Sequence, residues 1–144
     1  MVEELALASI YINQDDSLRA ATLTGSGNVF SVGWEIPRVS SLQEFSRYQG
    51  AKAIADIQKP VVAAINGDAV GQGLELALAA DIRIAASTAC FAMPQLHYGL
   101  LPWDGGAQRL ARIVGRAHAL ELLLTGETIE AETALRMGLV SKVV

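Results

Sequence analysis

Apolar positions along the chain follow two spacings, one helical and one continuous. Leu7, Ile10 and Tyr11 fit one face of a helix, which we predict over residues 1–12. Residues 61–65 form an unbroken apolar run, typical of a strand that is buried on both faces of a parallel sheet. The same approach predicts further strands at 20–24 and 82–85, and further helices at 41–57, 71–80, 105–114, 116–125 and 130–137.

The order of these elements indicates an α/β fold. Strands alternate with helices along the whole chain, which favours a parallel sheet with right-handed crossovers. Gly115, Gly126 and Gly138 lie where helix ends need a left-handed residue. The sequence contains no internal repeat and no linker, so we predict a single domain over residues 1–144.

Composition narrows the class of protein. The 144 residues are 51% apolar and 18% charged, as in ordinary globular proteins. The net charge of −4, without any block of Lys or Arg, argues against nucleic-acid binding. The lone Cys90 cannot form an internal disulfide, so we expect a reducing, cytoplasmic location. We expect no membrane association, because the uncharged stretch at 84–103 contains Pro94, and Glu3 and Glu4 stand where an export signal would be basic.

A turn bracketed by glycines after the run at 61–65 is the first candidate for chemistry. Gly71 and Gly73 would let another group approach the backbone closely. The helix that begins there presents amides without intrahelical partners and a partial positive charge, which suit an anion or a developing oxyanion. The alternative is a tight turn before a well-packed helix.

Glu75 lies just after this turn, among the apolar residues of the predicted helix. An ionised carboxylate there would lose hydration, so its pKa should rise, a property that general acids and bases need. The alternative is that Glu75 only complements the helix dipole in the first turn.

Other kinds of site find little support in the sequence. Leu76 stands where a dinucleotide-binding motif that begins at Gly71 would need its third glycine. A Walker loop, zinc-ligand spacing and a Gly-x-Ser-x-Gly elbow are all missing from the sequence. Because His97 and His118 are isolated, we predict no metal site and a structural role for each of them. The motifs above indicate no separate cofactor either.

Several motifs follow one another along the chain: TGSGNVFSVGWE (24–35), KPVVAAING (59–67), GQGLELALAADIRIA (71–85), GGAQRL (105–110), LTG (124–126) and ALRMGLV (134–140). In this order and spacing they resemble the enoyl-CoA hydratase/isomerase, or crotonase, superfamily. The similarity runs from about Leu18 to Val144, and the combination of motifs is far more specific than any one of them.

This resemblance implies a spiral of ββα units around a parallel sheet core. It also implies an acyl-CoA thioester as substrate, with coenzyme A as part of that substrate, and a homo-oligomer, either a trimer or a hexamer. The two amides that hold the thioester oxygen would belong to Trp34 and Gln72, and one catalytic glutamate would be Glu75. The residues expected to contact the substrate are Val32, Gly33, Gly71, Gly73, His97 and Trp103.

The chain departs from the family pattern inside the site. Gln95 stands where family hydratases carry a second catalytic glutamate, and an amide cannot exchange a proton as a carboxylate does. Asp104 lies one position beyond the aspartate of other family members and is a candidate for the missing acid; the alternative is that it caps the helix beginning near Gly105. Trp34 replaces a small residue and either lines the acyl pocket or belongs to the core.

The ends of the chain depart as well. Compared with full-length members of the family, the chain lacks N-terminal strands and C-terminal helices, so the resemblance suggests truncation at both ends. We expect Arg83 and Arg109 to form structural ion pairs rather than to touch the substrate. The leading hypothesis is a hydratase/isomerase whose catalytic candidates are Glu75, Gln95 and Asp104. The alternatives are a double-bond isomerase with one base and a catalytically silent protein that binds CoA.

Overall fold

A computed structural model describes residues 1–33 and 49–144. The first part of the helix predicted at 41–57 lies outside these residues, as does Trp34. The later part of that helix is confirmed as α3 (Gly50–Ala55).

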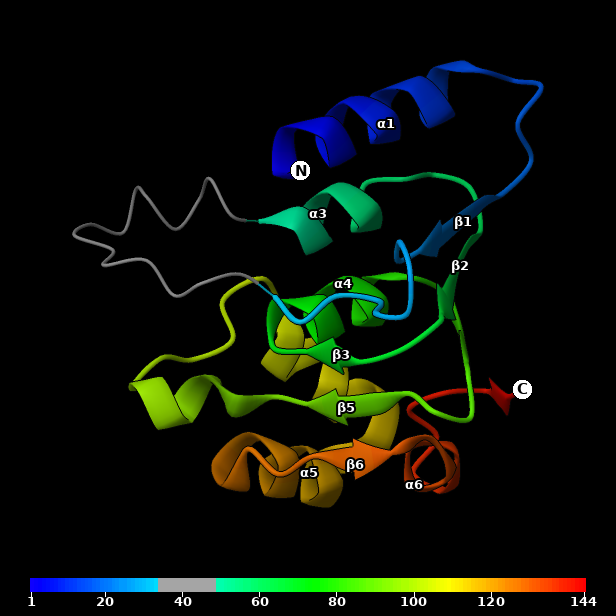
Figure 1. Ribbon diagram of the computed structural model, residues 1–144. Helices are drawn as coiled ribbons and strands as arrows, with labels where there is room; N and C mark the ends of the chain where they lie inside the picture. The colour runs from blue at the N-terminus through cyan, green and yellow to red at the C-terminus, as the bar shows by residue number, and fades with distance from the viewer. Residues whose placement is uncertain (34–48) are drawn as a thin grey trace.

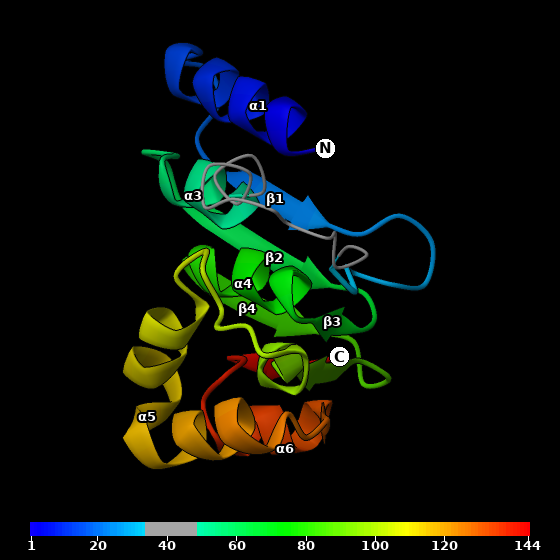
Figure 2. The ribbon, with the colours of Figure 1, turned by 90° about the vertical axis from the view of Figure 1, so that its left-hand side faces the viewer.

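The larger sheet is parallel throughout. Its strands are β1 (Ala21–Thr24), β2 (Val61–Ile65), β4 (Ile82–Ala85) and β7 (Lys142–Val143), in the order β1-β2-β4-β7 (Figures 1 and 2). In β2 buried and half-buried residues alternate, so neither face of this strand is open to solvent. The predicted central strand is therefore confirmed, with one face more deeply covered than the other.

A second, smaller sheet was not predicted from the sequence. It contains β3 (Ala69–Val70), β5 (Cys90–Ala92) and β6 (Ile129–Glu130), with β3 parallel and β6 antiparallel to β5. Each of these strands has only two or three residues, too few to show a period in the sequence. Successive turns of the chain place one strand in each sheet, β2 and β3 and then β4 and β5, as the expected ββα spiral requires.

Helices enclose the sheets. The α-helices besides α3 are α1 (Val2–Gln14), α4 (Gln72–Ala79), α5 (Gly106–Thr125) and α6 (Ala131–Arg136), and a 3₁₀ helix, η2 (Pro94–Tyr98), was not predicted. The two helices predicted at 105–114 and 116–125 form one element, kinked at Gly115, whose φ and ψ are 80° and 162°. Gly126 and Gly138 also have positive φ, as predicted. The predicted helix at the start is confirmed, but its Leu7, Ile10 and Tyr11 face solvent.

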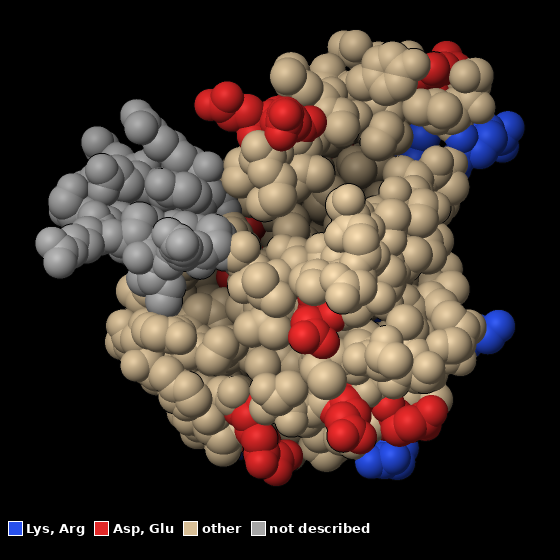
Figure 3. Space-filling view, viewed as in Figure 1, with Lys and Arg blue, Asp and Glu red and all other residues tan. Residues whose placement is uncertain are grey.

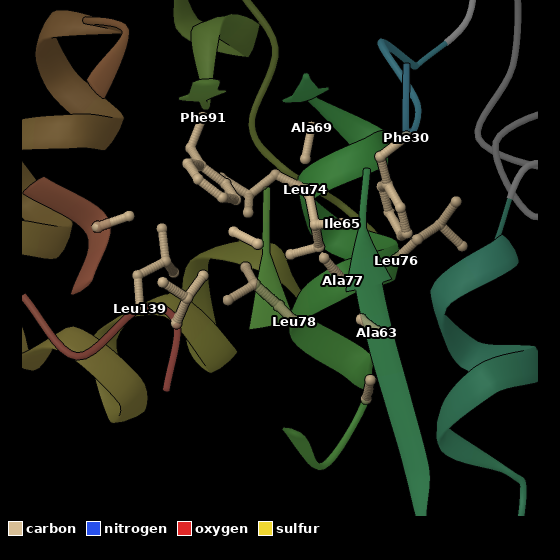
Figure 4. Packing of buried hydrophobic residues seen from close by; sticks show 14 of the residues in the cluster. Phe30, Ala63, Ile65, Ala69, Leu74, Leu76, Ala77, Leu78, Phe91 and Leu139 are labelled. Carbon is tan, nitrogen blue, oxygen red and sulfur yellow. The ribbon is translucent and has the colours of Figure 1, made fainter. Parts of the chain in front are cut away.

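Helix α4 is the centre of the hydrophobic core. Residues 72–78 are all buried, and the helix packs against α3, β3 and α5. Figure 4 shows Leu74 and Leu78 of this helix among side chains from both sheets, including Ile65 of β2 and Phe91 of β5. Because the residues of α4 other than Gln72 and Glu75 are all Gly, Ala or Leu, only a position between other elements can bury this helix. Within the described residues, no helix is long and apolar enough to cross a membrane.

Phe91 tests how much this core contributes to stability. Its side chain is fully buried, so we expect Phe91→Ala to lower the free energy of unfolding by about 3–5 kcal/mol, through lost burial and the cavity left behind. Leu124→Ala is the matched control, because Leu124 is 65% exposed and its truncation should change stability by no more than about 0.5 kcal/mol. Urea denaturation of both variants measures the difference. Equal effects would contradict the assignment of Phe91 to the core.

Candidate active site

A glycine turn connects β3 to α4. Gly71 caps the helix with φ 58° and ψ −121°, a backbone conformation that residues with a Cβ rarely adopt. Its N–H donates to the carbonyl of Ala92 at 2.9 Å, which anchors the turn to β5. The first residue of α4, Gln72, is therefore held at the edge of the smaller sheet.

The segment that ends at Gly33 runs alongside the start of α4. The carbonyl of Ser31 accepts a hydrogen bond from Val70 N–H at 2.9 Å, and a Cβ on Gly73 would overlap the same carbonyl oxygen. A Cβ on Gly33 would lie 3.5 Å from the amide nitrogen of Gln72. The close approach to the backbone that the glycine pattern predicted is thus confirmed. At Gly73 the group that approaches is the backbone of Ser31, from another segment of the same chain.

A pocket opens beside this junction. It has a volume of about 150 Å³ and is walled mainly by apolar side chains. Its lining residues are Val32, Gly33, Val70, Gly71, Gln72, Pro94, Gln95, Tyr98, Leu100 and Trp103. Of the residues predicted to contact substrate, the structure brings together Val32, Gly33, Gly71 and Trp103, with Gln72 and Gln95 from the other predicted roles.

Two predicted substrate contacts do not line this pocket. Nε2 of His97 lies 2.8 Å from the carbonyl oxygen of Thr125, so the ring lies at the C-terminal end of α5. Gly73 packs against Ser31, as described above. A contact of His97 or Gly73 with the substrate stays a prediction.

Glu75 is held by two backbone amides. Its Oε1 accepts hydrogen bonds from the N–H groups of Asp104 and Gly106, each at 2.9 Å, and the side chain is fully buried. A Cβ on Gly106 would lie 2.6 Å from Cγ and 2.7 Å from Oε1 of Glu75, so only glycine leaves room for the carboxylate there. Sequence reasoning missed Gly106, although the pair of glycines at 105–106 was a signal.

Burial raises the pKa of Glu75 to about 7. The hydrogen bond from Gly106 N–H opposes this shift, and the nearby negative charge of Asp104 adds to it. The raised pKa agrees with the prediction made from the apolar neighbours of Glu75. A carboxyl with a pKa near neutrality can both accept and release a proton under physiological conditions.

Gln95 joins Glu75 to the pocket. Its Nε2 donates to Oε2 of Glu75 at a distance of 3.4 Å, and the residue is 7% exposed. Its Oε1 is buried and has no hydrogen-bond partner among the described residues. An amide neither gives nor takes a proton at ordinary pH, so Glu75 has no second carboxylate on this side.

The carboxylate of Asp104 caps a different helix from the one expected. Oδ2 accepts from Ala51 N–H at 2.6 Å and Oδ1 from Lys52 N–H at 3.1 Å, so the side chain caps α3. The alternative that it caps the helix beginning near Gly105 is wrong, because α5 has no side-chain cap. Burial raises the pKa of Asp104, and the amides of Ala51 and Lys52 oppose that shift.

Two arginines from the sequence motifs hold backbone carbonyls. Arg83 donates to Leu139 O and Ala80 O, both at 2.7 Å, and Arg109 donates to Asp104 O at 2.6 Å. Both arginines thus hold backbone carbonyls of the fold, where the sequence led us to expect ion pairs with carboxylates. On the face in Figure 3, the Lys and Arg side chains of the described residues lie near the periphery.

Comparisons with known proteins agree with this arrangement. The family model for enoyl-CoA hydratase/isomerase matches residues 1–144. The probable enoyl-CoA hydratase echA8 of Mycobacterium leprae is 40% identical over the whole chain, and the chain covers 58% of it. The short-chain-enoyl-CoA hydratase of Clostridium acetobutylicum is 41% identical, over 92% of this chain and 54% of its own length.

The chain belongs to the enoyl-CoA hydratase/isomerase family. A solved structure of DspI from Pseudomonas aeruginosa, 40% identical, superimposes with a TM-score of 0.94 over 99% of this chain and 58% of that one. The crotonase fold is therefore confirmed. The chain spans little more than half the length of these members of the family.

The buried carboxyl of Glu75 should make stability depend on pH. Its pKa is about 7 in the folded protein, against 4.5 for an ordinary glutamate. The folded state therefore retains this proton to higher pH than the unfolded chain, and the stability is full below about pH 4.5 and declines as the pH rises through about 7. Relative to Glu75→Gln, which cannot ionise, we expect the wild type to lose about 3 kcal/mol between pH 4.5 and pH 8 in urea denaturation. A constant difference between the two proteins would show that Glu75 ionises normally.

Gly106→Ala should displace the carboxylate of Glu75. The added Cβ has no room beside Cγ and Oε1, so we expect a loss of about 1–3 kcal/mol in stability and a further rise of the Glu75 pKa as the amide bonds weaken. Urea denaturation and NMR titration of the glutamate carboxyl carbons measure the two effects. Gln108→Ala, an exposed change in the same helical turn, is the control and should leave both quantities unchanged.

Proposed function

We propose that the chain acts on acyl-CoA thioesters by hydratase/isomerase chemistry, with Glu75 as the acid/base. The observation that carries the proposal is a fully buried carboxyl, held by two amides, with a pKa of about 7, adjacent to a pocket through Gln95. Membership of the family supports an acyl-CoA as substrate, with coenzyme A as part of that molecule.

The charge that develops during the reaction would be held at the start of α4. When a base removes a proton next to the thioester, the electron pair moves onto the thioester oxygen. Gln72 lines the pocket and is the first residue of α4, so its backbone amide belongs to a helix N-terminus, where the dipole favours negative charge. Trp34, the second predicted donor, lies outside the described residues, and its role stays a prediction.

Glu75 would carry protons in either reaction. In an isomerase the carboxylate would take a proton from one carbon of the acyl chain and return it to another. In a hydratase the resemblance implies a second carboxylate where this chain has Gln95, so Glu75 would have to take a proton from water while oxygen bonds to the β carbon and then deliver that proton to the α carbon by itself. Gln95 therefore favours the isomerase as the second candidate, because an isomerase needs only one group that carries protons.

The remaining predictions concern the whole protein. A catalytically silent homologue that binds CoA is the alternative outside catalysis, and Gln95 is the residue that favours it. A direct acid role for Asp104, a homo-oligomeric state and a cytoplasmic location all stay predictions. The apolar walls around Trp103 and Tyr98 support an acyl group at this place, without indicating which one.

Replacing Glu75 tests the proposal directly. We expect Glu75→Gln to lower the rate at least about 100-fold, because the amide keeps the shape of the side chain and loses its proton transfer. The assay incubates the chain with a panel of unsaturated acyl-CoA thioesters in deuterated water, and mass spectrometry detects added water and exchanged deuterons. Glu121→Gln, at a residue whose side chain is 56% exposed on α5, is the control and should keep the full rate.

The products separate the alternatives. Added water identifies a hydratase, and deuterium exchange without added water identifies an isomerase or a related enzyme that forms an enolate. Binding of the thioester without either change would support the silent homologue. Full activity of Glu75→Gln would contradict the role given to Glu75.

A further inference from the structure

The loop at 104–106 connects three parts of the protein at one residue. The backbone N–H of Asp104 donates to Glu75, its carbonyl accepts from Arg109, and its carboxylate accepts from the first amides of α3. These contacts belong to α4, α5 and α3 respectively. Asp104 is thus fixed by its backbone N–H, its backbone carbonyl and its side chain at once.

The side chain of Asp104 is placed for support and not for contact with a ligand. Asp104 is 5% exposed, and both carboxylate oxygens already accept hydrogen bonds from α3. The residues that line the described pocket include Trp103 and exclude Asp104. The carboxylate therefore has its partners on the side of α3, while the backbone of the same residue holds Glu75.

We propose that Asp104 is a positioning residue, whose carboxylate fastens the loop at 104–106 to the start of α3 and thereby keeps two amides on Glu75. The proposal rests on the role of Glu75 given above. It departs from the expectation that Asp104 donates a proton itself. The residue acts through its backbone, and the side chain determines where that backbone lies.

The environment of Glu75 makes the proposal measurable. The charged groups that act on its carboxyl are Asp104 in the loop and Arg109 on α5, and η2 contributes the neutral amide of Gln95. Glu75 is the only charged residue of α4, and Lys52 of α3 pairs with Asp56 at the surface. A substitution at Asp104 should therefore have two opposite effects on the pKa of Glu75. Loss of the Asp104 charge lowers this pKa, and loss of the amide hydrogen bonds raises it.

Two variants of Asp104 separate the effect of its charge from the effect of the amide hydrogen bonds. Asp104→Asn removes the charge and keeps one oxygen acceptor, so the loop stays in place and the pKa of Glu75 should fall. Asp104→Ala removes both acceptors and frees the loop. The pKa of Glu75 should then rise, because the lost amide bonds outweigh the lost charge.

NMR titration of the glutamate carboxyl carbons and of the backbone amides measures the pKa of Glu75 in each variant. The Glu75→Gln variant assigns the carboxyl signal of Glu75, because this signal is missing from its spectrum. In the wild type the amide protons of residues 104 and 106 should shift together with Glu75, because they donate to it. In Asp104→Ala this coupling should disappear. The deuterium-exchange rate should fall roughly 10- to 100-fold with KM unchanged, and Asp104→Asn should restore it to within about threefold.

Asp81→Ala is the matched control. Asp81 also accepts from a backbone amide, that of Val61 at 2.7 Å, and lies beyond the C-terminal end of α4. Asp81→Ala removes a carboxylate that accepts a hydrogen bond from a backbone amide, as Asp104→Ala does, but it leaves the loop at 104–106 unchanged. The pKa of Glu75 should therefore stay as in the wild type. If Asp104→Ala does not fold, Asp104→Asn still tests the direction of the pKa shift.

Two results would overturn the proposal. Wild-type coupling and rate in Asp104→Ala would mean that Asp104 only caps α3. Complete loss of exchange in Asp104→Asn, with Glu75 still coupled to its amides, would mean that Asp104 carries a proton itself. If the wild type converts no acyl-CoA, the proposed function fails, but the titration still decides whether Asp104 positions Glu75.

Discussion

The buried carboxyl of Glu75 is the constraint around which the site is built. Helix α4 has to be apolar to lie at the centre of the core, and an ionisable group on it loses its hydration. The protein offsets this loss only in part, with two amides and one weak contact from Gln95. The incomplete compensation leaves the pKa near neutrality, where proton transfer in both directions is possible.

The spiral fold brings the other parts of the site to this carboxyl. Short strands of the smaller sheet fix both sides of the pocket, since Gly71 is anchored to β5 and the segment up to Gly33 lies along β3. The loop before α5 then returns from a distant part of the sequence to hold Glu75. Backbone hydrogen bonds, close packing at glycines and the carboxylate of Asp104 determine these positions.

The sequence predicts the elements of this structure better than their contacts. The run at 61–65 and the alternation of strands and helices indicate the parallel sheet, and the apolar neighbours of Glu75 indicate its pKa. The strands of the smaller sheet are too short to produce a pattern. The partners of His97 and Asp104 depend on packing between elements far apart in the chain, which no local pattern contains.

The hold on Glu75 comes from main-chain groups that every residue type except proline possesses. A substitution in the loop at 104–106 therefore displaces these donors, through crowding at residue 106 or through loss of the Asp104 carboxylate, and does not remove them. Trp103 lines the pocket and supplies neither of these two donors, so this wall is separate from the hold on the proton carrier. A protein engineer could change position 103 to alter the acyl group and keep both amides on Glu75, whereas a change at position 95 would also alter a contact of Glu75 itself.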